Sequence, residues 1–240
     1  MEYYGQYGED AVAHSLFKHQ PRGVFVDIGS HEGIRFSNSL LFEKLGWKCI
    51  LVEAHPDYYK LCVQNRPKST VLHYACGDHD ASGCEFFANF RGSLSTLNPN
   101  LDKVFHNDYA GYYAGNHING NVAGMVNGKI SVPMITLNTL LQHCGVAESE
   151  IDIISIDTDG SEKWVLDGFD IERWKPRIVI VEISVVPDVV QTFFDRTTYH
   201  KAFDNGTNAF YCRNVDDCER LKDAKITGKQ VKVLHPLDAR

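Results

Sequence analysis

The chain has 240 residues, of which 43% are hydrophobic and 23% are charged, and its net charge is −7. This composition is typical of a globular protein, and the acidic balance disfavours broad contact with nucleic-acid phosphates. The apolar runs are too short to span a membrane, the N-terminus lacks the apolar centre of a signal peptide, and the seven cysteines are odd in number and singly spaced. We therefore expect one cytoplasmic domain of residues 1–240 that does not associate with a membrane.

In the first third of the chain, short apolar runs alternate with amphipathic segments. Strands are predicted at residues 23–28, 49–53 and 70–75. Helices are predicted at residues 38–45, with Ser37 as the N-cap, and from Pro56 onwards, because proline suits the first helical position. This alternation predicts an α/β fold with a mainly parallel sheet flanked by helices.

Residues 88–128 differ from the segments on either side. Glycine, asparagine and aromatic residues are frequent there and periodicity is weak. We predict a long insertion or lid, because long loops in compact domains are often functional. Its Tyr109, Tyr112 and Tyr113 would either stack against a sugar or ring, or pack the insertion against the rest of the chain.

Regular alternation returns after residue 128. Strands are predicted at residues 129–133, 151–156 and 177–181, and helices at residues 137–144 and 161–168. Residues 198–203 and 209–213, separated by the turn-forming sequence DNGTN, predict an antiparallel hairpin. Residues 214–240 have mixed charge and predict only a C-terminal extension.

The sequence FVDIGSHEGIRFSN, residues 25–38, places a glycine-bearing turn directly after the first predicted strand. In an open α/β sheet, ligands bind beyond the carboxyl ends of the strands, where the strand order reverses. Glu53 ends the next strand, and an acid there can accept both hydroxyl protons of a ribose. The turn lacks the GxGxxG that a dinucleotide needs, so the pattern favours S-adenosylmethionine, which carries no phosphate. A turn whose glycines only let strand and helix meet is the alternative.

Several motifs resemble, in order, the FkbM-type methyltransferases. They comprise residues 4–10, 25–39, 45–56, 65–67, 155–162, 165–170 and 205–213. The resemblance implies a Rossmann-like sheet of seven strands with the last one antiparallel, S-adenosyl-L-methionine as the cofactor, and usually O-methylation. The family more often has Glu where this chain has Asp159.

The same resemblance implies which residues bind the cofactor. Those for the methionine portion are Asp27, Gly29, Ser30 and Gly33. Glu53 would bind the ribose, Gly77 and Asp78 would lie near the adenine, and Gln6 and Asn38 would reach the carboxylate end.

Two further strand-end acids, Asp157 and Glu182, are the predicted catalytic residues. Methyl transfer needs an aligned acceptor, and a hydroxyl acceptor must also lose its proton. We predict Asp157 nearest the transferring methyl and Glu182 positioning or deprotonating the acceptor. The purely structural roles open to them are a helix cap for Asp157 and an ion pair with a buried arginine for Glu182.

Asp159 stands three residues before Glu162, the spacing of a capping box. Asp157 and Asp159 with a histidine would be the start of a metal site. The sequence shows no second clustered carboxylate pair to complete it, so no metal is predicted.

The predicted function is O-methylation of a hydroxyl on a small molecule or glycan. An RNA ribose methyltransferase is an alternative, although such enzymes place lysines around the reactive hydroxyl and acids stand at these strand ends. Nucleic acid is therefore a disfavoured partner. A nicotinamide-dependent oxidoreductase and a non-catalytic Rossmann-like protein that binds a nucleoside are two further candidate functions.

Overall fold

The structure is a computed structural model that describes residues 1–101, 120–122, 125–226 and 228–233. The predicted stacking residues Tyr109, Tyr112 and Tyr113 lie outside the described residues. Within the part that is described, no helix is both long and apolar enough to cross a membrane.

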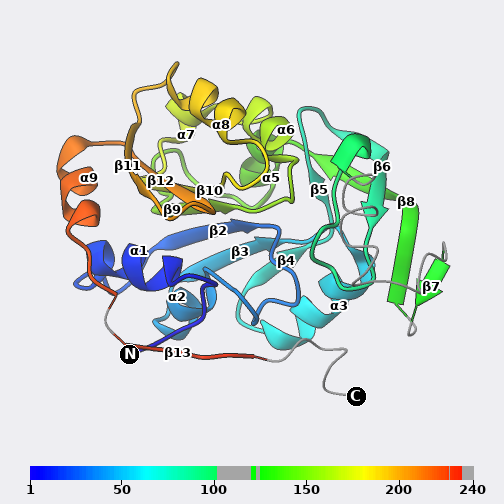
Figure 1. The fold of residues 1–240 in the computed structure, drawn as a ribbon, viewed down its shortest axis with the longest axis horizontal. Coiled ribbons are helices and arrows are strands. Elements are labelled where there is room, and N and C mark those ends of the chain that lie inside the picture. The colour runs from blue at the N-terminus through cyan, green and yellow to red at the C-terminus, as the bar shows by residue number, and fades with distance from the viewer. Residues whose placement is uncertain (102–119, 123–124, 227, 234–240) are drawn as a thin grey trace.

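A seven-stranded sheet forms the centre of the fold (Figure 1). Its strand order is β11-β12-β10-β9-β2-β3-β4. The strands are β2 (Val24–Ile28), β3 (Lys48–Val52), β4 (Thr70–Leu72), β9 (Ile153–Ile156), β10 (Ile178–Glu182), β11 (His200–Asp204) and β12 (Asn208–Cys212). All neighbours pair in parallel except β12, which is antiparallel to both β10 and β11. The predicted sheet, its antiparallel last strand and the closing hairpin are confirmed.

Helices cover both faces of this sheet because its central strands are apolar on both sides. On one face lie α5 (Leu137–His143), α6 (Glu162–Asp167), α7 (Ile171–Trp174) and α8 (Pro187–Phe194). On the other lie α1 (Glu9–Phe17), α2 (Leu40–Lys44), α3 (Pro56–Asn65) and α9 (Val215–Lys222). Alternate residues of β2 divide between the two cores: Val24, Val26 and Ile28 join the first and Phe25 the second.

Two predicted helix starts can be compared with the structure. α3 begins at Pro56 as expected, with His55 as its N-cap. The prediction of Ser37 as the N-cap of α2 is wrong, since Ser39 holds that position. Ser37 still contributes, because its hydroxyl accepts a hydrogen bond from Leu40 N at 3.2 Å.

The strand predicted at residues 70–75 is two strands in different sheets. β4 ends at Leu72, and β5 (Ala75–Cys76) pairs in parallel with β8 (Met125–Ile135). β8 also pairs with β6 (Ala81–Ala88) and β7 (Gly120–Val122), which makes a smaller sheet beside α3 (Figure 1). The described parts of the predicted insertion thus include the end of β6, all of β7 and the start of β8.

A separate two-stranded sheet joins the N-terminal segment to a strand near the end of the described residues. β1 (Glu2–Tyr3) pairs in parallel with β13 (Lys229–Gln230). The predicted C-terminal extension therefore contains α9, which packs against the central sheet, and β13, which fixes the N-terminal segment.

Candidate functional site

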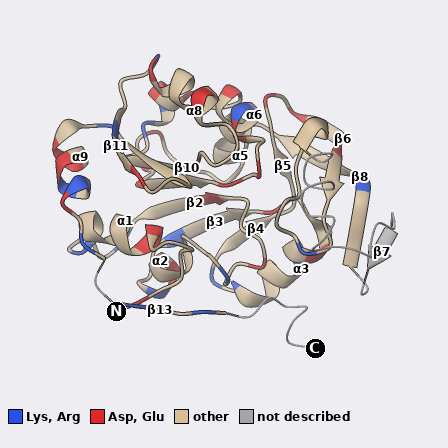
Figure 2. Ribbon diagram, viewed as in Figure 1, with Lys and Arg blue, Asp and Glu red and all other residues tan. Residues whose placement is uncertain are grey.

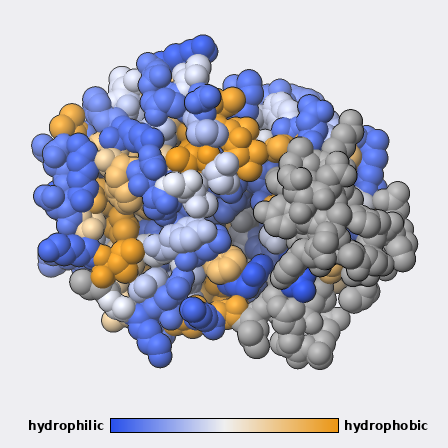
Figure 3. Space-filling model, viewed as in Figure 1, coloured by the Kyte–Doolittle hydropathy of each residue, from blue (hydrophilic) through white to orange (hydrophobic). Residues whose placement is uncertain are grey.

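A cavity of about 610 Å³ opens beyond the carboxyl ends of β2, β3, β9 and β10. This volume is within the range of small-molecule sites. Figure 3 shows one face of the molecule, on which hydrophilic residues predominate among the described ones and hydrophobic residues gather in patches. Figure 2 shows acidic residues within the central strands as well as on the outer helices.

The strand register places the acids of the cavity in one row. Ile28 pairs with Val52 on one side and with Ile156 on the other, and Ile156 pairs in turn with Val181. The residues that follow these four are Gly29, Glu53, Asp157 and Glu182, and all of them line the cavity. The sheet itself therefore brings together strand ends that lie far apart in the sequence.

The glycines of the turn are required by contacts within the chain. Gly29 has φ 86°, and a Cβ atom there would lie 1.7 Å from the carbonyl oxygen of Asp157. Gly33 has φ 80°, and its Cβ would lie 2.6 Å from Cγ of Arg66. Gly29 lines the cavity as well, whereas Gly33 is not among the lining residues. Close packing of strand and helix thus explains why both positions are glycine.

Glu53 is held rigidly at the cavity wall. It is 7% exposed; one carboxylate oxygen accepts from His31 N at 2.7 Å and the other from His55 N at 2.8 Å. Burial raises the pKa of Glu53 to about 7, although these backbone donors favour the ionised form. Each oxygen keeps a lone pair for a further donor, so the group can accept hydrogen bonds from two hydroxyls.

Asp27 and Asn38 lie deeper, between the sheet and α2. Burial raises the pKa of Asp27 to about 6, against the opposing effects of the Ser39 hydroxyl and the Arg66 guanidinium. Asn38 donates through Nδ2 to the Ser155 hydroxyl at 3.1 Å. Its Oδ1 is buried and has no hydrogen-bond partner among the described residues. A ligand cation or N–H group can satisfy that oxygen.

The remaining predicted cofactor residues divide into two groups. Ser30 and Gln6 line the cavity, with Ser30 buried and Gln6 exposed. Gly77 and Asp78 are not among the lining residues. Gly77 N donates to Ile135 O at 3.1 Å, because the chain leaves the central sheet after Leu72. The wall on that side is formed instead by Ala54, Tyr74, Ala75, Cys76, Phe86 and Leu97.

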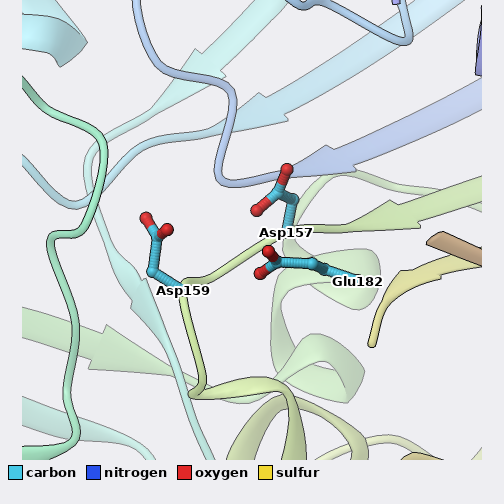
Figure 4. A group of neighbouring side chains, drawn as sticks. All are labelled: Asp157, Asp159 and Glu182. Carbon is cyan, nitrogen blue, oxygen red and sulfur yellow. The ribbon is translucent and has the colours of Figure 1, made fainter. Parts of the chain in front are cut away.

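Four carboxylates gather at the end of β9 and β10. Oxygen atoms of Asp157, Asp159 and Glu182 lie within 4.8 Å of one another (Figure 4). Burial, followed by the charge of Glu182, raises the pKa of Asp157 and of Asp159 well above the usual range. The same two causes raise the pKa of the neighbouring Glu162 to about 7. The arrangement can hold protons or a cation between these side chains.

The capping-box interpretation of Asp159 is wrong. The N-cap of α6 is Ser161, while Asp159 has φ 50° and accepts through Oδ2 from Leu94 N at 2.9 Å. Glu162 Oε1 accepts instead from Thr158 N and Gly160 N, at 2.9 and 3.2 Å. Glu162 thereby fixes the loop on which Asp157 and Asp159 stand.

Neither purely structural role considered for the catalytic pair is found. Asp157 is not the N-cap of α6. Glu182 hydrogen-bonds the hydroxyl of Ser184 and forms no ion pair with an arginine of the described part of the chain. Both carboxylates line the cavity.

A covering segment, residues 92–97, closes the cavity from the side of β6. Besides the bond from Leu94, Leu97 N donates to the Ser161 hydroxyl at 3.0 Å, and the Thr96 and Ser161 hydroxyls lie 2.8 Å apart. The glycine and asparagine content of residues 88–128 indicated a lid, but nothing in the sequence pairs Leu94 with Asp159.

Comparison with protein families matches residues 27–203 to the methyltransferase FkbM domain. The chain belongs to the FkbM methyltransferase family. It is therefore an S-adenosylmethionine-dependent methyltransferase, which confirms the predicted family and cofactor. No curated protein matches the sequence.

Three solved structures are similar to this FkbM chain. One is precorrin-6y C5,15-methyltransferase from Geobacter metallireducens GS-15, with 12% identity, 80% of this chain and 71% of that chain covered, and a TM-score of 0.41. The second is a TehB-like SAM-dependent methyltransferase from Corynebacterium glutamicum, with 11% identity, coverage of 85% and 88%, and a TM-score of 0.40. The third is TrmK of M. capricolum with S-adenosyl-homocysteine, at 6% identity, coverage of 84% and 65%, and a TM-score of 0.36. At such scores these likenesses carry no functional argument.

The residues of this FkbM chain fit S-adenosylmethionine. Glu53 offers two fixed acceptor oxygens for a ribose diol, and the orphaned, buried Oδ1 of Asn38 offers an acceptor for the ammonium group. The apolar wall around Tyr74 and Phe86 offers a surface for a nucleobase.

Proposed function

We propose that the protein transfers the methyl group of S-adenosylmethionine to a hydroxyl of a small molecule or glycan. The observation that carries this proposal is the row of strand-end acids, in which Glu53 lies on one side of Gly29 and Asp157 on the other. Glu53 is available to a ribose, Asp157 does not cap α6, and Glu182 pairs with no arginine of the described residues, which supports the proposal.

For the cofactor, we assign Glu53 to the ribose and Asn38, Asp27 and Ser30 to the methionine portion. Gln6 stands at the exposed rim of the same cavity. Gly77 and Asp78 lie outside the lining, so we assign the adenine to the apolar wall of Ala54, Tyr74 and Phe86.

For the transfer, we assign Asp157 as the acid nearest the methyl group and Glu182 as the group that orients the acceptor and takes its proton. When bound, S-adenosylmethionine supplies an already activated methyl group. In such a transfer the acceptor oxygen would bond to the methyl carbon while the electron pair of the broken sulfur–methyl bond stays on sulfur, and Glu182 would take the hydroxyl proton. The remaining task of the chain is alignment in a cavity with little water.

The charge of the site favours a neutral or cationic acceptor over a polyanion. Asp157, Asp159 and Glu182 line the transfer end with Glu162 buried behind them, and Arg35 is the one lysine or arginine of the described residues that lines the cavity. An RNA backbone would bring phosphates toward these carboxylates, which is unfavourable. This supports a small molecule or glycan over RNA.

The first test is calorimetry of the purified chain with S-adenosylhomocysteine, alongside Glu53→Ala. We expect the variant to bind about 10- to 100-fold more weakly, since two hydrogen bonds to a carboxylate are lost. Asp216→Asn, an exposed acid on α9, is the control and should bind like the wild type. Equal affinity of Glu53→Ala and wild type would contradict the assignment of Glu53.

The second test measures S-adenosylhomocysteine release with a panel of glycosides, polyols and phenols, and with uncapped and capped RNA. We expect turnover with a hydroxyl compound, and a product whose new methyl group is on oxygen. Methylation on nitrogen or carbon, or turnover with RNA alone, would contradict the proposal.

A further inference from the structure

The carboxylates at the ends of β9 and β10 are arranged around a common space. Asp157, Asp159 and Glu182 each offer an oxygen within 4.8 Å of the other two. In Figure 4 the carboxylates of Asp157 and Glu182 lie one above the other, with that of Asp159 across from them. Two oxygens that each lie about 2.0 to 2.6 Å from one divalent cation are separated from each other by about 5 Å or less, which is the spacing found here.

A fourth acid supplies an independent observation. Glu162 is fully buried, at 0% exposure, and its Oε2 has no hydrogen-bond partner among the described residues. Its other oxygen is used by Thr158 and Gly160, in the loop that carries Asp157 and Asp159. Glu182 Oε2 is likewise buried without a partner there. A buried carboxylate oxygen without a partner is unfavourable unless a proton or a cation satisfies it.

No positively charged side chain in the described part of the chain pairs with these carboxylate oxygens. Neither the three clustered acids nor Glu162 forms an ion pair with a lysine, arginine or histidine there. These acids accept hydrogen bonds from backbone N–H groups, such as that of Leu94, and from hydroxyls, such as that of Ser184, and the carboxyl groups of Asp157 and Glu182 hydrogen-bond each other. No protein cation of this region therefore pairs with the cluster.

We propose that Asp157, Asp159 and Glu182 bind one divalent cation at the transfer end of the cavity, with Glu162 supporting the loop from behind. An all-oxygen ligand set without cysteine or histidine selects Mg²⁺, Mn²⁺ or Ca²⁺ over Zn²⁺ or Cu²⁺. Three protein oxygens leave open positions on a six-coordinate ion, and all three residues line the cavity.

This proposal deepens the proposed function and rests on it. A cation at these residues holds an acceptor oxygen beside the methyl group and lowers the pKa of the hydroxyl that is methylated. Since more than one position is open, the class of acceptor it favours has two neighbouring oxygens, as in a vicinal diol or a hydroxy acid. The hydroxyl proton still passes to the carboxylate oxygen of Glu182 that is not on the ion.

The test uses the full chain, stripped of metal with a chelator and dialysed, and Mn²⁺ as the probe. Free Mn²⁺ is followed by electron paramagnetic resonance during a titration. We expect one saturable site per chain and competition by Mg²⁺. Asp159→Asn and Glu182→Gln should each weaken Mn²⁺ binding by more than about tenfold. Asp159→Asn retains a side-chain oxygen that can accept from Leu94 N. The thermal unfolding of both variants is compared with that of the wild type to confirm that they fold.

Asp216→Asn is the matched control and should bind Mn²⁺ like the wild type, since Asp216 is exposed on α9. The cation site would be overturned if folded wild type showed no saturable Mn²⁺ binding. It would also be overturned if both cluster variants bound Mn²⁺ as tightly as the wild type. Calorimetry with S-adenosylhomocysteine in metal-free buffer separates the two proposals. Cofactor binding without Mn²⁺ binding rejects the cation and leaves the proposed function standing, whereas loss of cofactor binding is a failure of the proposed function itself.

Discussion

The two ends of the cavity use carboxylates in opposite ways. At the ribose end a single acid, Glu53, has a backbone N–H on each oxygen and is fixed before any ligand arrives. At the transfer end Asp157, Asp159 and Glu182 crowd one another, and Glu182 keeps a buried oxygen without a partner among the described residues. The first arrangement suits recognition of hydroxyl donors, and the second suits a group that brings or removes positive charge. On the proposed roles, the row of strand ends thus separates cofactor binding from methyl transfer within a few residues.

The largest expected effect comes from Gly29, which lies between the two ends. Gly29→Ala places a methyl group against the Asp157 carbonyl and a non-glycine residue at φ 86°. We expect a loss of about 3 kcal/mol or more in the free energy of unfolding, measured in urea. Gly46→Ala is the control, because it has φ 88° but open space around its Cβ, and should cost about 1 to 2 kcal/mol. Equal losses would show that backbone conformation, and not contact with β9, makes Gly29 essential.

Asp157→Asn tests the transfer end alone. We expect the rate of methyl transfer to fall by about 10²- to 10⁴-fold while the affinity for S-adenosylhomocysteine stays within a factor of about three. Stopped assays with the best acceptor of the panel measure the rate, and calorimetry measures the affinity. If Asp157→Asn lowered cofactor affinity and transfer rate to the same degree, the proposed division between a binding end and a transfer end would be wrong.

The ribose end should respond to pH. Glu53 has a pKa of about 7 in the folded chain, above the usual 4.5, so it binds a proton more tightly when folded. Its contribution to stability is therefore greatest below pH 4.5 and is lost as the pH rises to about 7. Binding of ribose hydroxyls needs the ionised form, so affinity for S-adenosylhomocysteine should rise by up to about tenfold per pH unit below about pH 7 and level off above it.

Calorimetry between about pH 5.5 and 8.5 measures that profile, a range that spans the titration of Glu53. Glu53→Gln should remove the part of the pH dependence of this affinity that is due to Glu53. Asp27, with a pKa of about 6, sets the part that remains. An unchanged profile in Glu53→Gln would assign the whole pH dependence to another group.

Asn38 should give the smallest effect. Asn38→Ala removes the buried Oδ1 assigned to the ammonium group and the bond to Ser155. We expect affinity for S-adenosylhomocysteine to fall about 3- to 10-fold, and adenosine, which lacks the ammonium, to bind the variant and the wild type alike. Equal weakening toward both ligands would place Asn38 away from the methionine portion.

The sheet and its strand-end acids follow from local sequence. Apolar runs predict β2, β3, β9 and β10, and an acid directly after such a run must lie at the carboxyl edge, as Glu53 after β3 and Asp157 after β9 do. Gly77 and Asp78 could not be placed in this way. Their position depends on β5 pairing with β8, a strand that lies far along the chain.

The contacts of Asp159 show the same limit. A capping box uses a spacing of three residues, and DGSE has that spacing, yet Asp159 binds Leu94, which is distant in sequence. α1 was not predicted either, because its N-cap is Gly8 in a left-handed conformation, with no side-chain cap to mark it. Local patterns therefore identify acids at strand ends, but not the loops that close over them.

The bond from Leu94 N to Asp159 joins the cover of the cavity to its reactive end. A hydrogen bond to a charged acceptor is stronger than one to a neutral acceptor, so the covering segment is held most firmly when Asp159 carries its charge. By thermodynamic linkage, anything that stabilises that charge also favours the closed cover, and a closed cover favours the charge to the same extent. The hydrogen bond that holds residues 92–97 to Asp159 and the ionisation of Asp159 are thus coupled.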